Sequence, residues 1–156
     1  MLLLRTILFT LLAPLMVTII IPALIVWRYP VWMVDLGLFR WLGLPLVVIA
    51  GAIYIWCAAD FYRARGTPAP ADPPKELVVR GLYRYTRNPM YVGVFTAITG
   101  MAILLGSVLL LAYLLLVFSL MHLFVTRYEE PHLRRVFGAA YEDYCRRVPR
   151  WLGRRR

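Results

Sequence analysis

The sequence predicts an all-α, polytopic membrane protein with about four transmembrane helices, an interfacial motif segment and a short cytoplasmic C-terminal helix. Hydrophobic residues make up 62% of the 156 residues, against roughly 45–50% apolar content in soluble domains. They gather in four long runs at residues 6–27, 40–62, 89–105 and 108–128. Basic residues flank these runs, and the length is that of a single membrane domain covering residues 1–156.

The first two runs are long enough to cross a bilayer, which needs about 20 apolar residues. Pro14 and Pro22 are expected to kink the first run, which membrane helices tolerate. This run is interpreted as a retained span, because no small-residue cleavage site closes it. In the second run, Ala50, Gly51 and Ala52 predict close contact with a neighbouring helix.

A polar, proline-rich stretch at residues 63–74 separates the two halves of the chain and is too polar for a helix. Residues 75–87 are interpreted as an interfacial segment rather than a span. The third run is at the short limit for crossing a bilayer. Gly106 and Ser107 predict a tight turn into the fourth run, which a charged tail follows. We expect that tail to form a short helix and a basic end.

The distribution of positive charge predicts the topology. The formal net charge is +10, from 18 Lys and Arg and eight Asp and Glu residues. In a four-span arrangement only Arg28 and Arg40 fall on one side of the membrane, and all other basic residues fall on the opposite side. The positive-inside rule then places both termini and the motif segment on the cytoplasmic face of the cell inner membrane. Since the charges flank apolar runs, they indicate contact with anionic lipid rather than nucleic acid.

The two cysteines give no sign of a disulfide or a metal site. Cys57 lies inside a span and Cys145 lies near the C-terminus, and neither occurs in a metal-ligand spacing. No metal ligand is therefore predicted.

The start of the third run combines charge, aromatic rings and helix-start signals. Asn88 is a good helix N-cap and Pro89 suits the first helical position. The positive end of the helix dipole would then face Arg87, which makes a plausible seat for a carboxylate. The alternative is an interfacial anchor, because Tyr and Arg favour headgroup depth in any membrane protein.

The adjacent acidic residues Glu129 and Glu130 follow the fourth run. The hairpin returns the chain to the face where it entered, so this pair is expected near Arg87. A ligand with an amine and a carboxylate could place its ammonium on the pair and its carboxylate on Arg87. Tyr83 and Tyr91 could offer ring faces or hydroxyl groups to such a ligand. The alternative is a solvated helix end whose carboxylates face nearby arginines.

Two stretches resemble the isoprenylcysteine carboxyl methyltransferase and phospholipid methyltransferase superfamily. Residues 81–93 read GLYRYTRNPMYVG and residues 129–133 read EEPHL. They are followed by Phe137-Gly138, by Tyr141 and Tyr144, and by VPRW at residues 148–151. The resemblance covers the C-terminal half, from about residue 79 to residue 151. One departure is Asn88, where many relatives have His.

The resemblance implies an integral membrane enzyme that uses S-adenosylmethionine at the cytoplasmic face. Carried over by position, residues 87–91, with Arg87, Asn88, Pro89 and Tyr91, would hold the cofactor together with Glu129 and Glu130. Val79, Gly81 and Tyr83 would line its pocket. The implied partners are a lipophilic methyl acceptor and membrane lipids, and no obligate protein partner is evident. The acceptor group, whether carboxyl, amine or thiol, stays open.

The candidate catalytic residues are Arg87, Glu129 and His122. Methyl transfer from a sulfonium requires mainly in-line positioning in a water-poor site. His122 is the only histidine inside a predicted span and precedes Glu129 by seven residues, so it could serve as a base or orient the acceptor. The alternative is a histidine that only packs.

Two other functions fit the same sequence. A sterol-type membrane reductase shares a related C-terminal pattern but uses a nicotinamide cofactor, NADPH. A small membrane scaffold would use Arg, Tyr and Glu only to anchor the hairpin. Binding of S-adenosylhomocysteine, of NADPH, or of neither distinguishes the three.

Overall fold

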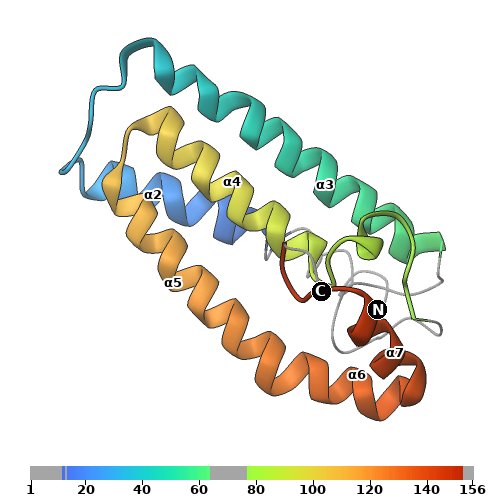
Figure 1. Ribbon diagram of the computed structural model, residues 1–156. Coiled ribbons are helices and arrows are strands. Elements are labelled where there is room, and N and C mark those ends of the chain that lie inside the picture. Colours follow the sequence, from blue (N-terminus) through green and yellow to red (C-terminus); the bar gives the residue numbers. More distant parts are fainter. Residues whose placement is uncertain (1–11, 13, 64–76, 153–156) are drawn as a thin grey trace.

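The structure is a computed structural model that describes residue 12, residues 14–63 and residues 77–152. All its named elements in these ranges are helices, which confirms the all-α class. Three long helices, α3 (Gly43–Arg63), α4 (Pro89–Leu105) and α5 (Val108–Phe124), lie alongside the shorter α2 (Ile21–Arg28) (Figure 1). The short helices α6 (Glu130–Phe137) and α7 (Ala139–Arg147) lie at the end where α4 begins.

The first apolar run is helical up to Arg28, one residue beyond its predicted end. A π-helical turn, η1 (Met16–Ile20), lies between its two prolines and leads into α2. Thr18 donates a hydrogen bond to the carbonyl of Pro14 at 2.6 Å, and such side-chain contacts help to satisfy backbone groups near a proline. The part of this run before residue 12 lies outside the described residues.

The four predicted spans correspond to two helices of spanning length and two shorter apolar helices. By length and composition, the continuous helices Gly37–Arg63 and Val108–Phe137 are sufficient to cross a membrane. The first begins with a 3-10 segment, η2 (Gly37–Leu42), before α3. Met16–Arg28 and Pro89–Leu105 are apolar but shorter. The fourth run does not stop at residue 128, because a π-helical turn, η4 (Val125–Glu129), continues α5 into α6.

Small residues bring α3 and α4 into close contact. A Cβ atom on Gly43 would lie 2.2 Å from the carbonyl oxygen of Gly100, and one on Gly100 would lie 2.7 Å from that of Gly43. Gly93 lies against Ala50 and Ile53 of α3. The predicted close contact of the second run is therefore confirmed for Ala50, which meets Gly93 of α4. For Gly51 it is wrong, because nothing lies within 4 Å of its added Cβ.

The turn between α4 and α5 is tight, as predicted. Gly106 adopts a φ of 64°, the left-handed conformation in which glycine ends a helix without strain. The connection after α2 packs under this turn, where the N–H of Val34 donates to the carbonyl of Gly106 at 2.7 Å. An added Cβ on Gly106 would lie 2.2 Å from the Val34 carbonyl oxygen. Both the left-handed backbone conformation and the nearby Val34 carbonyl therefore exclude a side chain at position 106.

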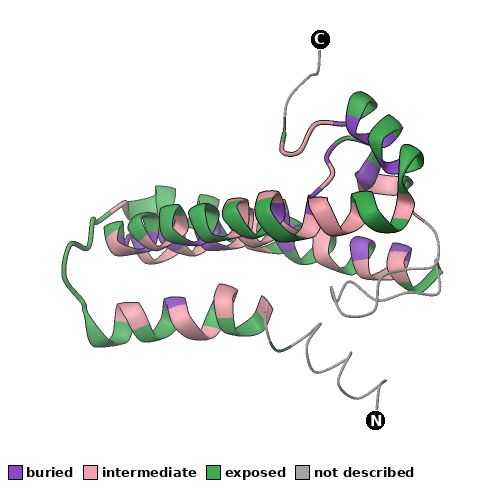
Figure 2. Ribbon diagram, turned by 90° about the horizontal axis from the view of Figure 1, so that it is seen from below, coloured by how far each residue is buried: buried purple, intermediate pink, exposed green. Residues whose placement is uncertain are grey.

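The tail forms two short helices rather than the single one predicted. Gly138, with a φ of 51°, separates α6 from α7. Buried residues of α7 and the residue after it, Tyr141, Tyr144, Cys145 and Val148, form a small core with neighbours that include Leu133. Figure 2 shows buried positions both along the α3–α4 contact and at this end of the molecule. The tail is therefore packed onto the end of the helices where the two motifs meet.

Candidate functional site

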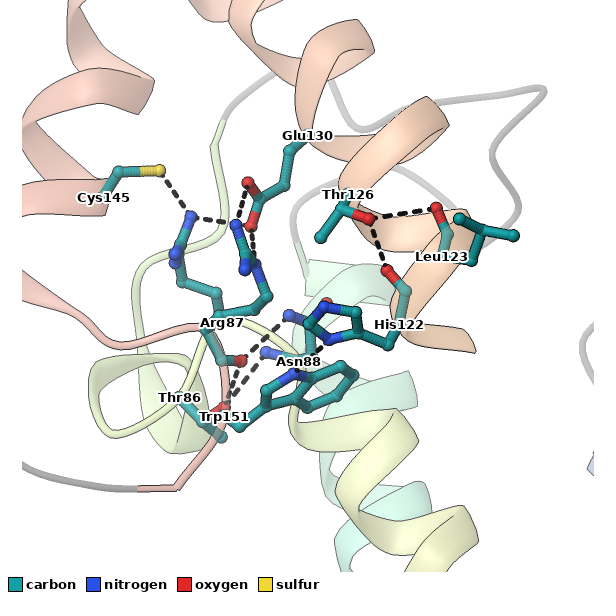
Figure 3. Close-up of polar contacts among 10 residues, drawn as sticks. Thr86, Arg87, Asn88, His122, Leu123, Thr126, Glu130, Cys145 and Trp151 are labelled. Carbon is teal, nitrogen blue, oxygen red and sulfur yellow. Dashed lines mark hydrogen bonds and ion pairs between the residues drawn. The ribbon is translucent and has the colours of Figure 1, made fainter. Parts of the chain in front are cut away.

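Three segments that are distant in sequence meet at one end of the molecule. They are the motif segment (residues 78–91), the end of α5 with η4 and α6, and residues 148–152, which we call the strap. The carbonyl of Pro149 accepts a hydrogen bond from the N–H of Arg87 at 2.9 Å. The carbonyl of Arg150 accepts from the hydroxyl of Thr86 at 3.0 Å and from the amide of Asn88 at 2.9 Å. The strap is thus held directly against the start of α4 (Figure 3).

A buried ion cluster joins the motif segment, α6 and the strap. NH1 of Arg87 lies 3.0 Å from Oε1 of Glu130, and both side chains are about 5% exposed. Arg150 donates to the same carboxylate through Nε at 2.7 Å and NH2 at 2.9 Å, in a two-pronged arrangement. Burial opposes ionisation of Glu130, but the hydrogen bonds from Arg150 and the charge of Arg87 outweigh it and lower its pKa.

Arg87 is held by this internal network. Besides its bond to Glu130, its NH1 donates to Sγ of Cys145 at 2.7 Å. Its Nε is buried and has no hydrogen-bond partner within the described part of the chain. NH1 of Arg87 is therefore engaged within the protein, whereas its Nε–H has no partner among the described residues.

Glu129 has a different environment from its neighbour Glu130. The hydroxyl of Tyr91 donates to its Oε2 at 3.0 Å, and no arginine pairs with it among the ion pairs of the described residues. Burial, with a smaller contribution from the charge of Glu130, raises the pKa of Glu129, although the Tyr91 hydrogen bond opposes the rise. The acidic pair thus contains one carboxylate saturated by arginines and one that still has acceptor capacity.

The predicted pocket-lining residues of the motif segment lie in distinct environments. Val79 is exposed. Gly81 begins a 3-10 turn, η3 (Gly81–Arg84), with a φ of 57°. Tyr83 is buried against Phe61 of α3, with ring centroids 5.7 Å apart, and its carbonyl accepts from the Tyr144 hydroxyl at 2.8 Å. The motif segment is therefore packed against both α3 and α7.

The prediction that the Asn88 side chain caps α4 is wrong. Asn88 occupies the N-cap position and Pro89 the first helical position, but the Asn88 side chain makes no capping hydrogen bond. A cap requires an acceptor oxygen directed at the helix N–H groups, whereas here the Nδ2 amide donates to the carbonyl of Arg150. The hydroxyl of Thr86 instead accepts from the N–H of Asn88 at 3.3 Å. Asn88 therefore connects the motif segment to the strap.

His122 lies in an aromatic cluster rather than next to the acidic pair. Nε1 of Trp151 donates to Nδ1 of His122 at 3.1 Å. The imidazole stacks on Phe118, and the Trp151 indole also lies 5.6 Å from the Phe95 ring. Because Nδ1 accepts a hydrogen bond, the neutral ring carries its proton on Nε2. His122 is thereby fixed by the strap.

An apolar cleft of about 370 Å³ adjoins this cluster. The hydroxyl groups of two threonines on its wall are already hydrogen-bonded, since Thr96 and Thr99 each donate to a carbonyl of their own helix at 2.8 Å. They therefore present methyl groups to the cleft. The wall comprises Leu46, Val92, Phe95, Thr96, Thr99, Phe118, Trp151 and Leu152.

Sequence reasoning missed the contributions of Thr86, Cys145, Arg150 and Trp151. The only signal was the VPRW stretch, which the family resemblance includes without assigning it a role. Thr86 contacts Arg150, and Cys145 contacts Arg87. In each contact the two residues are about 60 positions apart in the sequence, so no local pattern reveals it. Within the described ranges, no group of three or more His, Cys, Asp or Glu side chains is placed to hold a metal ion.

Comparison with known proteins gives two curated relatives. The chain is 35% identical over 112 residues to the nickel-cobalt-cadmium resistance protein NccN of Alcaligenes xylosoxydans xylosoxydans, covering 72% of this chain and 48% of that protein. It is 39% identical over 74 residues to the protein-S-isoprenylcysteine O-methyltransferase of Schizosaccharomyces pombe, covering 47% of this chain and 31% of that protein. The alignments thus span about half of the first relative and about a third of the second. No solved structure gives a significant match.

The sequence profile of the phospholipid methyltransferase family matches residues 38–140. This match contains the motif segment, the α4–α5 hairpin and the acidic pair. The resemblance found in the sequence is confirmed, and the chain belongs to the phospholipid methyltransferase family.

Proposed function

We propose that the chain is a membrane methyltransferase that binds S-adenosylmethionine between the motif segment, the acidic pair and the strap, and methylates a lipophilic acceptor. The observation that carries this proposal is the division within the acidic pair. Glu130 is saturated by two arginines, whereas the half-buried Glu129 carboxylate has Tyr91 as its partner. A half-buried carboxylate with remaining acceptor capacity at the meeting point of the two motifs is suited to bind a cationic group.

The residues present fit the donor and acceptor groups of this cofactor. Glu129 would hold the ammonium group. Arg87, through its unpartnered Nε–H, and the amino end of α4 at Asn88 and Pro89 would hold the carboxylate. The pocket-lining residues would be Val79, Gly81, Tyr83 and Tyr91. Glu130 would contribute by holding Arg87 in place.

The bound cofactor supplies a methyl group that a sulfonium has already activated. The protein then has to orient donor and acceptor and to exclude water. The Trp151 indole lines the apolar cleft, which would accept a hydrocarbon part of the acceptor. His122, held through Nδ1, would donate a hydrogen bond from its Nε2–H to the acceptor group and orient it. We place the reaction at the cytoplasmic face of the inner membrane, on the basis of the charge distribution.

Ligand titration of the purified, detergent-solubilised protein tests this proposal. S-adenosylhomocysteine should raise the melting temperature in a saturable way, because a ligand that binds only the folded state stabilises it by mass action. NADPH should produce no shift. A shift with NADPH alone would support the reductase, and no shift with either ligand would support the scaffold.

The acceptor can then be identified by its product. Lipid extracts incubated with the protein and methyl-labelled cofactor should yield a labelled lipophilic compound by mass spectrometry. The mass and fragmentation of the product distinguish a carboxyl, an amine and a thiol acceptor. Label confined to water-soluble products would contradict a lipophilic acceptor.

A further inference from the structure

A buried carboxylate outside the two motifs has no role in the function proposed so far. Asp60 lies near the end of α3 and is only 2% exposed. Its ion pairs are long, since Oδ1 lies 3.6 Å from Nε of Arg80 and 3.7 Å from NH1 of Arg63. Its Oδ2 is buried and has no hydrogen-bond partner among the described residues. A buried charge with so few partners is destabilising, so its presence at this position needs another explanation.

The unpartnered oxygen lies against the backbone of the motif segment. A Cβ atom built on Gly81 would lie 2.3 Å from Oδ2 of Asp60. Gly81 also has a φ of 57°, so this position requires glycine for its conformation as well as for the approach of the carboxylate. On the preceding residue, NH2 of Arg80 donates to the backbone carbonyl of Asp60 at 2.8 Å. Asp60 thus contacts two consecutive residues, Arg80 immediately before the η3 turn and Gly81 at its start.

The same face of α3 also contacts Tyr83, which lies two residues after Gly81 in that turn. Cys57 and Phe61 lie three positions before and one position after Asp60, and both pack against Tyr83. One helical face therefore fixes residues 80–83 at both ends. The N-terminal half of the chain, which carries no motif of its own, determines where the motif segment lies.

We propose that Asp60 is a positioning residue for methyl-donor binding. Its carboxylate holds Arg80 and Gly81 so that residues 79–83 form the wall of the cofactor pocket. This inference rests on the proposed function, because the pocket is the one assigned there. Asp60 would not touch the cofactor, since its free oxygen is covered by Gly81.

The decisive variant is Asp60→Asn, which keeps the shape of the side chain and removes its charge. The dissociation constant for S-adenosylhomocysteine should rise about tenfold, which corresponds to about 1.4 kcal/mol. It is measured by calorimetry on the folded fraction, well below the melting temperature. Asp143→Asn is the matched control, because Asp143 forms an exposed ion pair with Arg146 on α7 and should bind as the wild type does. In turnover assays, KM for the methyl donor should rise more than kcat falls.

A second pair of variants tests the contact itself and does not depend on Asp60→Asn being well folded. Gly81→Ala should weaken binding by itself. Combining it with Asp60→Ala removes the nearer of the two side chains that the new methyl group would meet, the other being Trp56, so the combined loss should be smaller than the sum of the single losses. A wild-type affinity in Asp60→Asn, or additive losses in the double variant, would overturn the positioning role. Absence of S-adenosylhomocysteine binding by the wild-type protein would instead overturn the proposed function.

Discussion

Glu130 and Arg87 form an ion pair of 3.0 Å in which both side chains are almost completely buried. The two residues come from different motifs, on either side of the α4–α5 hairpin. Their pairing joins these motifs, and the two-pronged contact of Arg150 attaches the strap to the same carboxylate. The ion cluster therefore has a structural role, and the neighbouring Glu129 is the carboxylate that we propose binds the ligand.

Replacing the two acidic residues separately should separate these roles. Glu130→Gln leaves Arg87 as a buried charge without its counter-ion, which should lower the free energy of unfolding by about 3–5 kcal/mol. Glu129→Gln should change stability little but weaken S-adenosylhomocysteine binding about ten- to a hundredfold, the effect of one lost charge-assisted contact. Denaturant unfolding and calorimetric titration measure the two effects. Equal effects of both variants on stability and on binding would contradict a structural role for Glu130 that is separate from a binding role for Glu129.

The opposite pKa shifts of the pair predict opposite pH dependences. The folded-state pKa of Glu130 lies below its ordinary value of 4.5, so its contribution to stability is present above that value and is lost as the pH falls through the folded pKa. The pKa of Glu129 is raised from 4.5, so its contribution is present below that value and is lost as the pH rises through the folded pKa.

Melting temperatures measured between about pH 4 and pH 8 check this prediction. Relative to the wild type, Glu129→Gln should become more stable as the pH rises. Glu130→Gln should be most destabilised at neutral pH and least destabilised at the acidic end. Parallel curves for all three proteins would contradict the assigned shifts.

Trp151→Phe should isolate the hydrogen bond between the strap and His122. The phenyl ring retains most of the aromatic contacts but has no N–H group to donate to Nδ1. The free energy of unfolding should fall by about 0.5–1.5 kcal/mol, with little change in S-adenosylhomocysteine affinity. In the presence of an identified acceptor, KM for that acceptor should rise, because Trp151 lines the apolar cleft. An unchanged acceptor KM would limit Trp151 and His122 to packing.

Two glycines with opposite environments form a matched pair for stability. Gly106→Ala introduces a side chain at a φ of 64° and directly against the Val34 carbonyl, so it should destabilise the fold by about 1–3 kcal/mol. Gly51→Ala lies within α3 with nothing close to its new Cβ atom, and should be neutral or stabilising by up to about 1 kcal/mol. Thermal unfolding of the two variants in the same detergent gives the comparison. A larger loss for Gly51→Ala would contradict the helix packing described above.

The predicted topology can be tested with single introduced cysteines. Positions in residues 64–74, which lie outside the described residues, and the exposed Leu152 should react only from the cytoplasmic side. Leu38, which is 85% exposed in the η2 segment before α3, should react from the outside. Cys57 and Cys145 are both buried, so they provide a low background. Labelling of residues 64–74 from the outside would overturn the positive-inside assignment.

The parts of the fold that could be predicted depend on strong local signals. The bounds of α4 follow from proline at its first position and glycine after its last. The meeting of the two motifs followed from the hairpin alone. The continuation of α5 beyond residue 128 could not be predicted, because charged residues there resembled a helix end and nothing in the pattern identifies a π-helical turn.

The partners within the candidate site depend on tertiary contacts. The type of residue at position 88 favoured a cap, but the carbonyl of Arg150 competes for the same side chain. Asp60 looked like an ordinary polar residue at a helix end, and only its placement against Gly81 gives it a possible role. Charge and helix periodicity indicate that such residues are polar or buried, but do not identify what they contact.

The π-helical turn Val125–Glu129 also bears on how related sequences should be compared. The N–H of Glu130 bonds to the carbonyl of Val125, five residues earlier, so this turn holds one residue more than a regular α-helical turn. Deleting one residue here would restore the regular helix and rotate the acidic pair by about 100° around the helix axis, away from Arg87. The orientation of the acidic pair therefore depends on the number of residues in this turn, and not only on which residues occupy it. In an alignment, a relative with a one-residue gap here would conserve both glutamates and still direct them elsewhere.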